Sequence, residues 1–145
     1  FLGYNVVSSD IVEGVDARNL PWGEGEVDLV YTHPPYWRAT KYTDDPRDLS
    51  NAPTYDAFLR GLEECLVEFY RVLKPGGLLV LVIGDYREKG RFYPISADTM
   101  VMARRVGFEP LTIWVHEVSA SGTAHIGTKF MMSHDYVQIF RKRTQ

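Results

Sequence analysis

The segment His33-Pro34-Pro35-Tyr36-Trp37 places a titratable ring, two prolines and two aromatic side chains in one short stretch. Proline has a fixed φ and no backbone N–H, so the carbonyl groups of His33 and Pro34 point in defined directions with no neighbouring donor to compete for them. Such carbonyls accept hydrogen bonds from a donor-rich group such as an amine. The flat rings of Tyr36 and Trp37 can stack on a heterocycle. The segment therefore suits an exocyclic amino group on a stacked base.

The elements that position this segment lie on both sides of it. Val27–Thr32 is rich in β-branched and aromatic residues, which predicts a strand that ends at His33. Thr54 can cap a helix whose apolar residues recur at helical spacing, and Lys74-Pro75-Gly76-Gly77 is expected to stop it. The continuous apolar run Leu78–Ile83 is typical of a parallel strand covered on both faces.

Strands and helices are expected to alternate along the rest of the chain, which argues for an α/β sheet that is mostly parallel. The last two strands are joined without a helix and predict an antiparallel C-terminal pair. Strands are expected at Tyr4–Asp10, Leu111–Val118 and Tyr136–Phe140, a strand or turn at Val12–Pro21, and a second helix from about Ala97, capped by Ser96 and stopped by Gly107. The polar segments 38–53, 85–94 and 119–129 are expected to be loops, the first ordered only in part and the last mobile.

Three polar residues follow directly on apolar runs. They are Asp10, His33 and Asp85, and in open α/β sheets ligands bind beyond the carboxyl ends of the strands. We expect all three at that edge, with Asp85 contacting the substrate. Arg87 and Lys89 lie in the same loop as Asp85 and form a local basic patch for the same purpose.

Composition limits the class of protein. At 145 residues with 45% apolar residues, one domain is expected, and a net charge of -3 confines any nucleic-acid contact to local patches. Cys65 is the single cysteine, which excludes an internal disulfide and a cysteine-rich zinc site. The spacing of His116, His125 and His134 suggests no metal site. No membrane span or signal peptide is visible, so a cytoplasmic protein is expected.

His33-Pro34-Pro35-Tyr36 resembles the motif (Asp/Asn/Ser)-Pro-Pro-(Tyr/Phe/Trp) of S-adenosylmethionine-dependent amino-methyltransferases, which modify N6 of adenine or N4 of cytosine in DNA. The segments on either side are similar to other parts of that family. Glu13–Pro21 resembles its cofactor-side acidic segment, Leu73–Gly77 its helix-to-strand segment and Ser133–Lys142 its last strand. The resemblance implies a Rossmann-like methyltransferase sheet and S-adenosylmethionine as the cofactor.

The resemblance also implies roles for the motif residues. In this family the target base is flipped out of the duplex. The side chain of His33 and the carbonyl of Pro34 would accept hydrogen bonds from its amino group, while Pro35 fixes the backbone. Tyr36 would stack on the base, and Trp37 would add a further contact. Transfer would be direct, with no covalent intermediate, so that positioning and electrostatics supply most of the rate.

The sequence departs from the family pattern in two places. Histidine takes the first motif position, and no glycine-rich strand-to-helix turn for the cofactor is present. Asp10 and Asp16 resemble the acids that contact the cofactor, although the residues between them are too few for a crossover helix. Residues 1–145 are therefore expected to form one catalytic domain whose N-terminal cofactor-binding part is incomplete, since family order puts the turn before Phe1.

Two alternatives keep parts of this interpretation. RNA or tRNA amino-methyltransferases carry related Pro-Pro motifs, so the sequence leaves open whether the substrate is DNA or RNA. A non-catalytic, methyltransferase-like subunit that only grips nucleic acid is the other alternative. The expected partner is DNA, and a restriction endonuclease or a second subunit is a candidate second partner. The sequence does not choose between adenine and cytosine.

Overall fold

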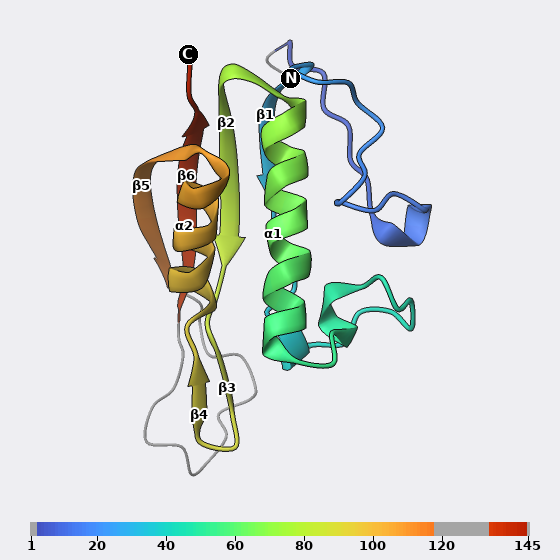
Figure 1. The fold of residues 1–145 in the computed structure, drawn as a ribbon, viewed down its shortest axis with the longest axis vertical. Coiled ribbons are helices and arrows are strands. Elements are labelled where there is room, and N and C mark those ends of the chain that lie inside the picture. Colours follow the sequence, from blue (N-terminus) through green and yellow to red (C-terminus); the bar gives the residue numbers. More distant parts are fainter. Residues whose placement is uncertain (1–2, 118–133, 145) are drawn as a thin grey trace.

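The computed structural model describes residues 3–117 and 134–144, and its centre is a four-stranded sheet with the order β1-β2-β6-β5 (Figure 1). Both α-helices lie side by side in front of this sheet in Figure 1. The elements are η1 (Ile11–Glu13), β1 (Val27–Thr32), η2 (Trp37–Ala39), η3 (Leu49–Asn51), α1 (Tyr55–Val72), β2 (Leu73–Ile83), β3 (Tyr86–Glu88), β4 (Arg91–Tyr93), α2 (Ile95–Val106), β5 (Phe108–Glu117) and β6 (His134–Lys142).

The sheet has the expected strand directions. β1 and β2 are parallel, whereas β6 lies between β2 and β5 and is antiparallel to both. β1, β2 and β5 therefore run the same way, and the predicted antiparallel C-terminal pair is confirmed. The predicted strand Val27–Thr32 has the observed bounds. β2 and β5 begin earlier than predicted, and β6 extends beyond the predicted strand at both ends.

Helix α1 forms for the local reasons expected. The Thr54 hydroxyl accepts a 3.1 Å hydrogen bond from the Ala57 N–H and so caps the first turn. Buried side chains such as Phe58, Leu62 and Leu66 lie on the face of α1 turned to the sheet. The helix ends at Val72, and the chain passes directly into β2.

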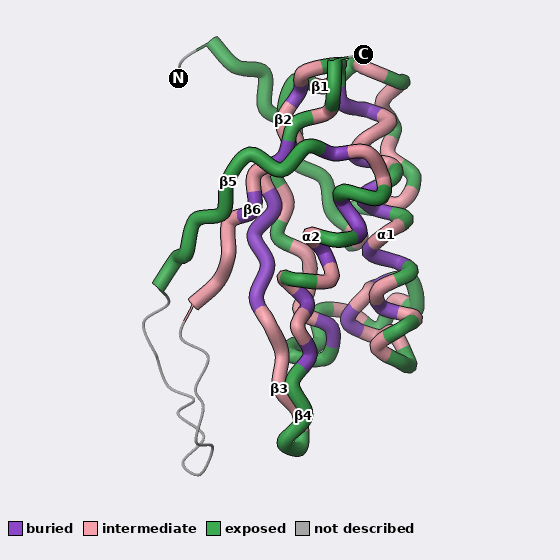
Figure 2. The backbone as a smooth tube through the Cα atoms, turned by 60° about the vertical axis from the view of Figure 1, so that its left-hand side comes forward, coloured by how far each residue is buried: buried purple, intermediate pink, exposed green. Residues whose placement is uncertain are grey.

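The core lies on one side of the sheet. In β2, Leu79 and Leu81 are fully buried whereas Leu78 and Val80 are half-buried, because α1 and α2 pack on the same face. Figure 2 shows the buried residues gathered where the two helices meet β2 and β6, while β5 is exposed beyond Phe108. Equal cover on both faces of β2, expected from its apolar run, is therefore not found within the described part of the chain.

The segment expected as a loop over residues 85–94 contains the hairpin β3–β4 instead. Lys89 and Gly90 connect its strands with φ values of 47° and 79°. Two consecutive residues with positive φ make the type of two-residue turn that matches the twist of paired strands. Because lysine rarely adopts this conformation, residue type alone gave little signal for the hairpin.

Segment 38–53 is also more regular than expected. It contains η3, and the Asn51 side-chain amide donates to the carbonyls of Thr43 and Asp45 at 3.0 and 2.8 Å. The buried Asp48 carboxylate accepts from the Thr43 N–H and hydroxyl, both at 3.0 Å. The polar residues of this segment led us to expect a loop that is ordered only in part. Their side chains instead form local hydrogen bonds that fix its backbone.

The strand expected at Tyr4–Asp10 is not formed. The side chains of Tyr4, Val6 and Val7 are 79%, 86% and 68% exposed, and no strand occurs among residues 3–26. A β-type run becomes a strand only when a partner strand accepts its backbone hydrogen bonds. The run 12–21 is turn and short η1 rather than strand, and the loop expected at 119–129 lies outside the described residues.

Candidate active site

The candidate site lies at the carboxyl edge of β1 and β2. These neighbouring strands are parallel, so His33, after β1, and Gly84, after β2, lie at the same edge. The antiparallel pair Ile83–Tyr136 also brings the start of β6 to this edge, with Asp135 next to Gly84. Sheet register therefore brings together three segments that are far apart in the sequence.

The first and last residues of the motif contact each other. The Nε2 atom of His33 lies 2.7 Å from the Tyr36 hydroxyl oxygen, and the two rings are tilted with centroids 5.5 Å apart. Pro34 and Pro35 lie between them and have no N–H to continue the ladder beyond the last pair, Thr32–Leu81. The prolines thus end the strand, and the His33 ring is exposed at its end.

Tyr36 is held against the neighbouring strand ends. A Cβ atom added to Gly84 would lie 2.5 Å from Cε2 of Tyr36 and 2.7 Å from Oδ1 of Asp135. Both side chains therefore pack over the backbone of Gly84, which has to be glycine for them to fit. Burial raises the pKa of Tyr36, and its hydrogen bond to the Asp135 carboxylate raises this pKa further.

Trp37 is placed differently from the expectation that it stacks on substrate. Its ring is 4% exposed and packs edge-on against Tyr86 and Tyr93, and its Nε1 donates a 2.9 Å hydrogen bond to the Ala52 carbonyl. Its φ of 50° turns the chain inward, into a left-handed conformation rare for a bulky residue. Trp37 is a core residue that fixes the direction of the motif, whereas Tyr36 is half-buried at the edge.

Asp85 and the hairpin lie next to the motif. The Asp85 Oδ1 atom accepts a 2.8 Å hydrogen bond from the Ser96 N–H and so satisfies the first turn of α2. Ser96 therefore lies inside the helix, and the expected cap role belongs to Asp85. In the hairpin, the Arg87 guanidinium lies 5.3 Å from the centre of the Phe92 ring, and Lys89 is exposed at the turn.

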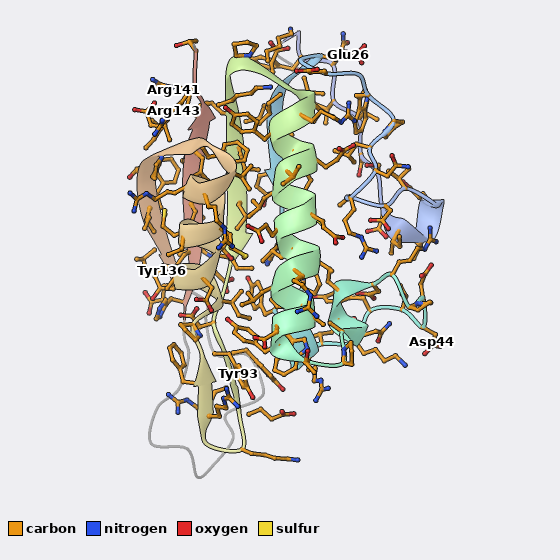
Figure 3. All side chains as sticks on the ribbon, in the orientation of Figure 1. Glu26, Asp44, Tyr93, Tyr136, Arg141 and Arg143 are labelled. Atoms are coloured by element: carbon orange, nitrogen blue, oxygen red, sulfur yellow. The ribbon has the colours of Figure 1, made fainter. Side chains whose placement is uncertain are left out.

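The C-terminal basic residues lie elsewhere. Figure 3 places Arg141 and Arg143 at the opposite end of the sheet from Tyr93, which belongs to the hairpin. The pairing of Arg141 with Leu78, near the start of the apolar part of β2, agrees with that position. The basic hairpin, not the basic tail, therefore accompanies the motif.

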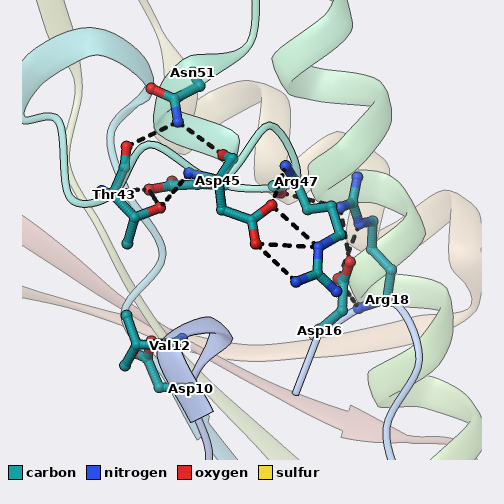
Figure 4. A network of polar contacts seen from close by, with 9 residues as sticks. Asp10, Val12, Asp16, Arg18, Thr43, Asp45, Arg47 and Asn51 are labelled. Atoms are coloured by element: carbon teal, nitrogen blue, oxygen red, sulfur yellow. Dashed lines mark hydrogen bonds and ion pairs between the residues drawn. The ribbon is translucent and has the colours of Figure 1, made fainter. Parts of the chain in front are cut away.

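Asp10 and Asp16 do not join the edge. Asp10 was expected beside His33, but it caps η1 by accepting a 3.0 Å hydrogen bond from the Val12 N–H, and no strand precedes it to carry it there. Asp16 forms a two-pronged pair with the Arg18 guanidinium, with distances of 3.0 and 2.8 Å (Figure 4). The hydrogen bond from Arg18 lowers the pKa of the Asp16 carboxyl.

The described residues fit only part of a methyl-transfer site. The edge offers acceptors for an amino group, but residues 3–26 contain no strand that could lead into a glycine-rich turn. The Asp16 carboxylate is already paired with Arg18, so it offers little to a ribose. Segments 3–117 and 134–144 thus carry acceptors at the edge that fit an amino group, and no adenosine cradle. Within them, no group of three His, Cys, Asp or Glu side chains could hold a metal ion.

The two residues that sequence reasoning missed are Gly84 and Asp135. Gly84 follows the predicted strand Leu78–Ile83 and was given no role, and Asp135 lay only in the segment Ser133–Lys142 that resembles the family's last strand. The signal that links them is the antiparallel register of β2 and β6, which cannot be read from either segment alone. No described helix is long and apolar enough to cross a membrane.

The sheet, with the motif at its carboxyl edge, has the α/β fold of solved methyltransferases. A solved structure of a candidate DNA modification methylase from Thermus thermophilus, in complex with S-adenosyl-L-methionine, has a TM-score of 0.66 and 32% identity. The match covers 90% of this chain and 52% of that one. A possible histamine N-methyltransferase from Thermotoga maritima shares the fold, with a TM-score of 0.53 and 23% identity over 88% of this chain and 61% of that one.

The model of the DNA methylase family, which comprises N6-adenine and N4-cytosine methyltransferases, matches residues 27–145, and the chain belongs to that family. The orphan methyltransferase M.BamHII of Bacillus amyloliquefaciens is 30% identical over 118 residues, and the type II methyltransferase M.BglII of Bacillus subtilis is 28% identical over 122. These alignments cover 81% and 82% of this chain. The chain spans only 37% and 31% of the two relatives.

Proposed function

We propose that this chain is the part of a DNA amino-methyltransferase that holds the target base, either adenine for N6 or cytosine for N4 methylation. The observation that carries the proposal is the arrangement at the carboxyl edge. His33 follows β1 and precedes two prolines, its ring contacts the Tyr36 hydroxyl, and the Tyr36 ring packs on Gly84. Family membership and the edge arrangement point to the same chemistry. The methyl group would come from S-adenosylmethionine, the ligand named in the Thermus structure.

The motif residues divide the task between them. His33 and the Pro34 carbonyl accept hydrogen bonds from the exocyclic amino group, which turns the nitrogen lone pair away from the ring and makes it available to a methyl group. Pro35 keeps the backbone in place, and the half-buried Tyr36 offers a ring face to a base extruded from the duplex. Positioning of the amino group is then the main contribution of this chain to the rate.

The hairpin is proposed to contact the DNA around the target base. Lys89 lies exposed at its turn, and Arg91 is exposed on β4. Both extend the carboxyl edge with positive charge, which attracts phosphate groups regardless of sequence. Asp85, which is half-buried and also caps α2, is proposed to border the base site. A restriction endonuclease partner and a cytoplasmic location stay predictions of the sequence.

Transfer of labelled methyl groups tests this function. The intact protein, incubated with labelled S-adenosylmethionine, should label duplex DNA and not tRNA, and digestion of the product should show N6-methyladenine or N4-methylcytosine. His33→Ala should lose at least about a hundredfold in turnover. Lys74→Ala, which removes a surface ion pair with Asp28 at the far end of β1 and β2, is the matched control.

Labelling of tRNA in preference to DNA would favour the RNA alternative. Absence of S-adenosylmethionine binding by the intact protein, measured by calorimetry, would favour the non-catalytic alternative. Equal turnover of wild type and His33→Ala would remove the motif from the reaction.

A further inference from the structure

Asp135, Tyr36 and His33 form a chain of polar contacts at the carboxyl edge. The Tyr36 hydroxyl lies 2.7 Å from His33 Nε2 on one side. On the other side the Asp135 carboxylate packs with the Tyr36 ring over Gly84 and raises the pKa of Tyr36. The backbone of Gly84 supports the middle of this chain, because the Tyr36 ring and the Asp135 carboxylate both pack over it. These residues come from the ends of three different strands.

The direction of the hydrogen bonds follows from counting protons. A carboxylate has no proton to donate, so the single hydroxyl proton of Tyr36 points to Asp135. The Tyr36 oxygen can then only accept from His33, which means that Nε2 carries the proton. In a neutral imidazole the other nitrogen, Nδ1, is unprotonated and is an acceptor.

We infer that Asp135 is a positioning residue that acts through Tyr36 to keep His33 in its Nε2–H form, with Nδ1 presented as the acceptor for the amino group of the target base. The inference rests on the proposed function for its substrate, but the proton arrangement exists without it. It also explains how histidine can occupy the first position of the motif. A histidine with a mobile proton would present an acceptor only part of the time, whereas a fixed Nε2–H form always presents one.

Charged and titratable groups around the hydroxyl are consistent with this arrangement. His33 contacts the hydroxyl, and the groups that raise the pKa of Tyr36 are Asp135 at the start of β6, Tyr31 on β1 and Tyr42 in the segment after η2. Of these, Asp135 is the carboxylate toward which the hydroxyl proton turns.

Nitrogen-15 NMR of labelled histidine in the intact protein tests the inference directly, without requiring methyl transfer. Above the pH range of histidine titration, His33 should show a protonated Nε2 and an unprotonated Nδ1. Asp135→Asn and Tyr36→Phe should both shift the signals toward a mixture of the two neutral forms. Asp98→Asn is the matched control, because Asp98 accepts a 2.6 Å hydrogen bond from Tyr55 in a second tyrosine–carboxylate pair that includes neither Tyr36 nor His33.

Turnover supplies a second measurement. Asp135→Asn should lower kcat by about tenfold to a hundredfold with little change in KM for DNA, because Asp135 orients an acceptor and does not itself contact the base. In a Tyr36→Phe background, Asp135→Asn should have no further effect on kcat, since the link between the residues is already broken.

The two failures are distinguishable. A protonated Nδ1 in the wild type, or signals unchanged by Asp135→Asn, would overturn the inference whatever the activity. The expected signals in a protein that methylates no DNA would instead overturn the proposed function and leave the proton arrangement in place.

Discussion

The indole Nε1 of Trp37 donates a 2.9 Å hydrogen bond to the carbonyl of Ala52, which joins the end of the motif to the segment leading into α1. The Trp37 backbone is left-handed, with a φ of 50°, and a bulky residue adopts this conformation only when its surroundings impose it. Here the surroundings are the aromatic rings of Tyr55, Tyr86 and Tyr93, against which the Trp37 ring packs. The direction of the motif therefore depends on the core, through a side chain that is almost fully buried.

Replacing Trp37 should affect stability before it affects chemistry. Trp37→Ala should lower the free energy of unfolding by about 3–5 kcal/mol, because a large buried ring is lost. Trp37→Phe keeps most of the packing but leaves the Ala52 carbonyl without its donor, at a cost of about 1–3 kcal/mol. Urea unfolding curves measure both values. A loss of DNA binding with unchanged stability would show instead that Trp37 contacts the base.

Adding a methyl group at Gly84 should disturb the site. In Gly84→Ala the new Cβ would clash with Tyr36 and Asp135, so we expect at least a tenfold loss of kcat and a stability cost of about 1–3 kcal/mol. Gly61→Ala is the control, because the one close approach of its Cβ, at 2.5 Å, is to the end of the flexible Leu49 side chain. Similar turnover for the two variants would contradict the role given to Gly84.

The rate of methyl transfer should fall at low pH. Histidine ordinarily gains a proton between about pH 8 and 5, and a cationic His33 has no acceptor left for an amino group. His33→Asn should be slower than wild type at neutral pH but should show no such fall, since an amide oxygen accepts at any pH in this range. A flat wild-type profile of kcat against pH would remove His33 from the acceptor role.

The Asp16–Arg18 pair should contribute pH-dependent stability. The pKa of Asp16 is lowered from 3.8 in the folded protein, so the contribution is present above that pH and is lost as pH falls through the folded pKa. Asp16→Asn should cost about 1 kcal/mol at pH 7, since the two side chains are only 21% and 25% exposed. The cost should be smaller at an acidic pH at which the Asp16 carboxyl is protonated in the folded protein. An equal cost at both pH values would show that the ion pair is not its source.

The hairpin should contribute to DNA affinity in a salt-dependent way. Lys89→Gln, which keeps the turn and removes one charge, should weaken binding and reduce the slope of log affinity against log salt by about one. Lys74→Gln at the other end of β2 is the control. Fluorescence anisotropy with a labelled duplex gives both slopes, and equal slopes for Lys89→Gln and wild type would place the DNA elsewhere.

Part of this protein is determined by the sequence alone. β1 has the predicted bounds, α1 begins after the predicted cap Thr54, and α2 ends just before the predicted stop Gly107. These features were predictable because caps, stops and apolar periodicity act over a few neighbouring positions. The motif could be found for the same reason, since two prolines after a strand fix the local backbone whatever surrounds them.

Only the tertiary structure decided which side chains form the site. The meeting of Tyr36, Gly84 and Asp135 depends on the register between β2 and β6, and sequence patterns within one strand do not specify its partner. The burial of Trp37 and the pairing of Asp16 with Arg18 could likewise not be predicted from the sequence. The same aromatic ring or carboxylate can occur in a core or in a binding site, so residue type does not distinguish the two. Local chemistry thus determined the motif, and long-range packing decided which residues support it.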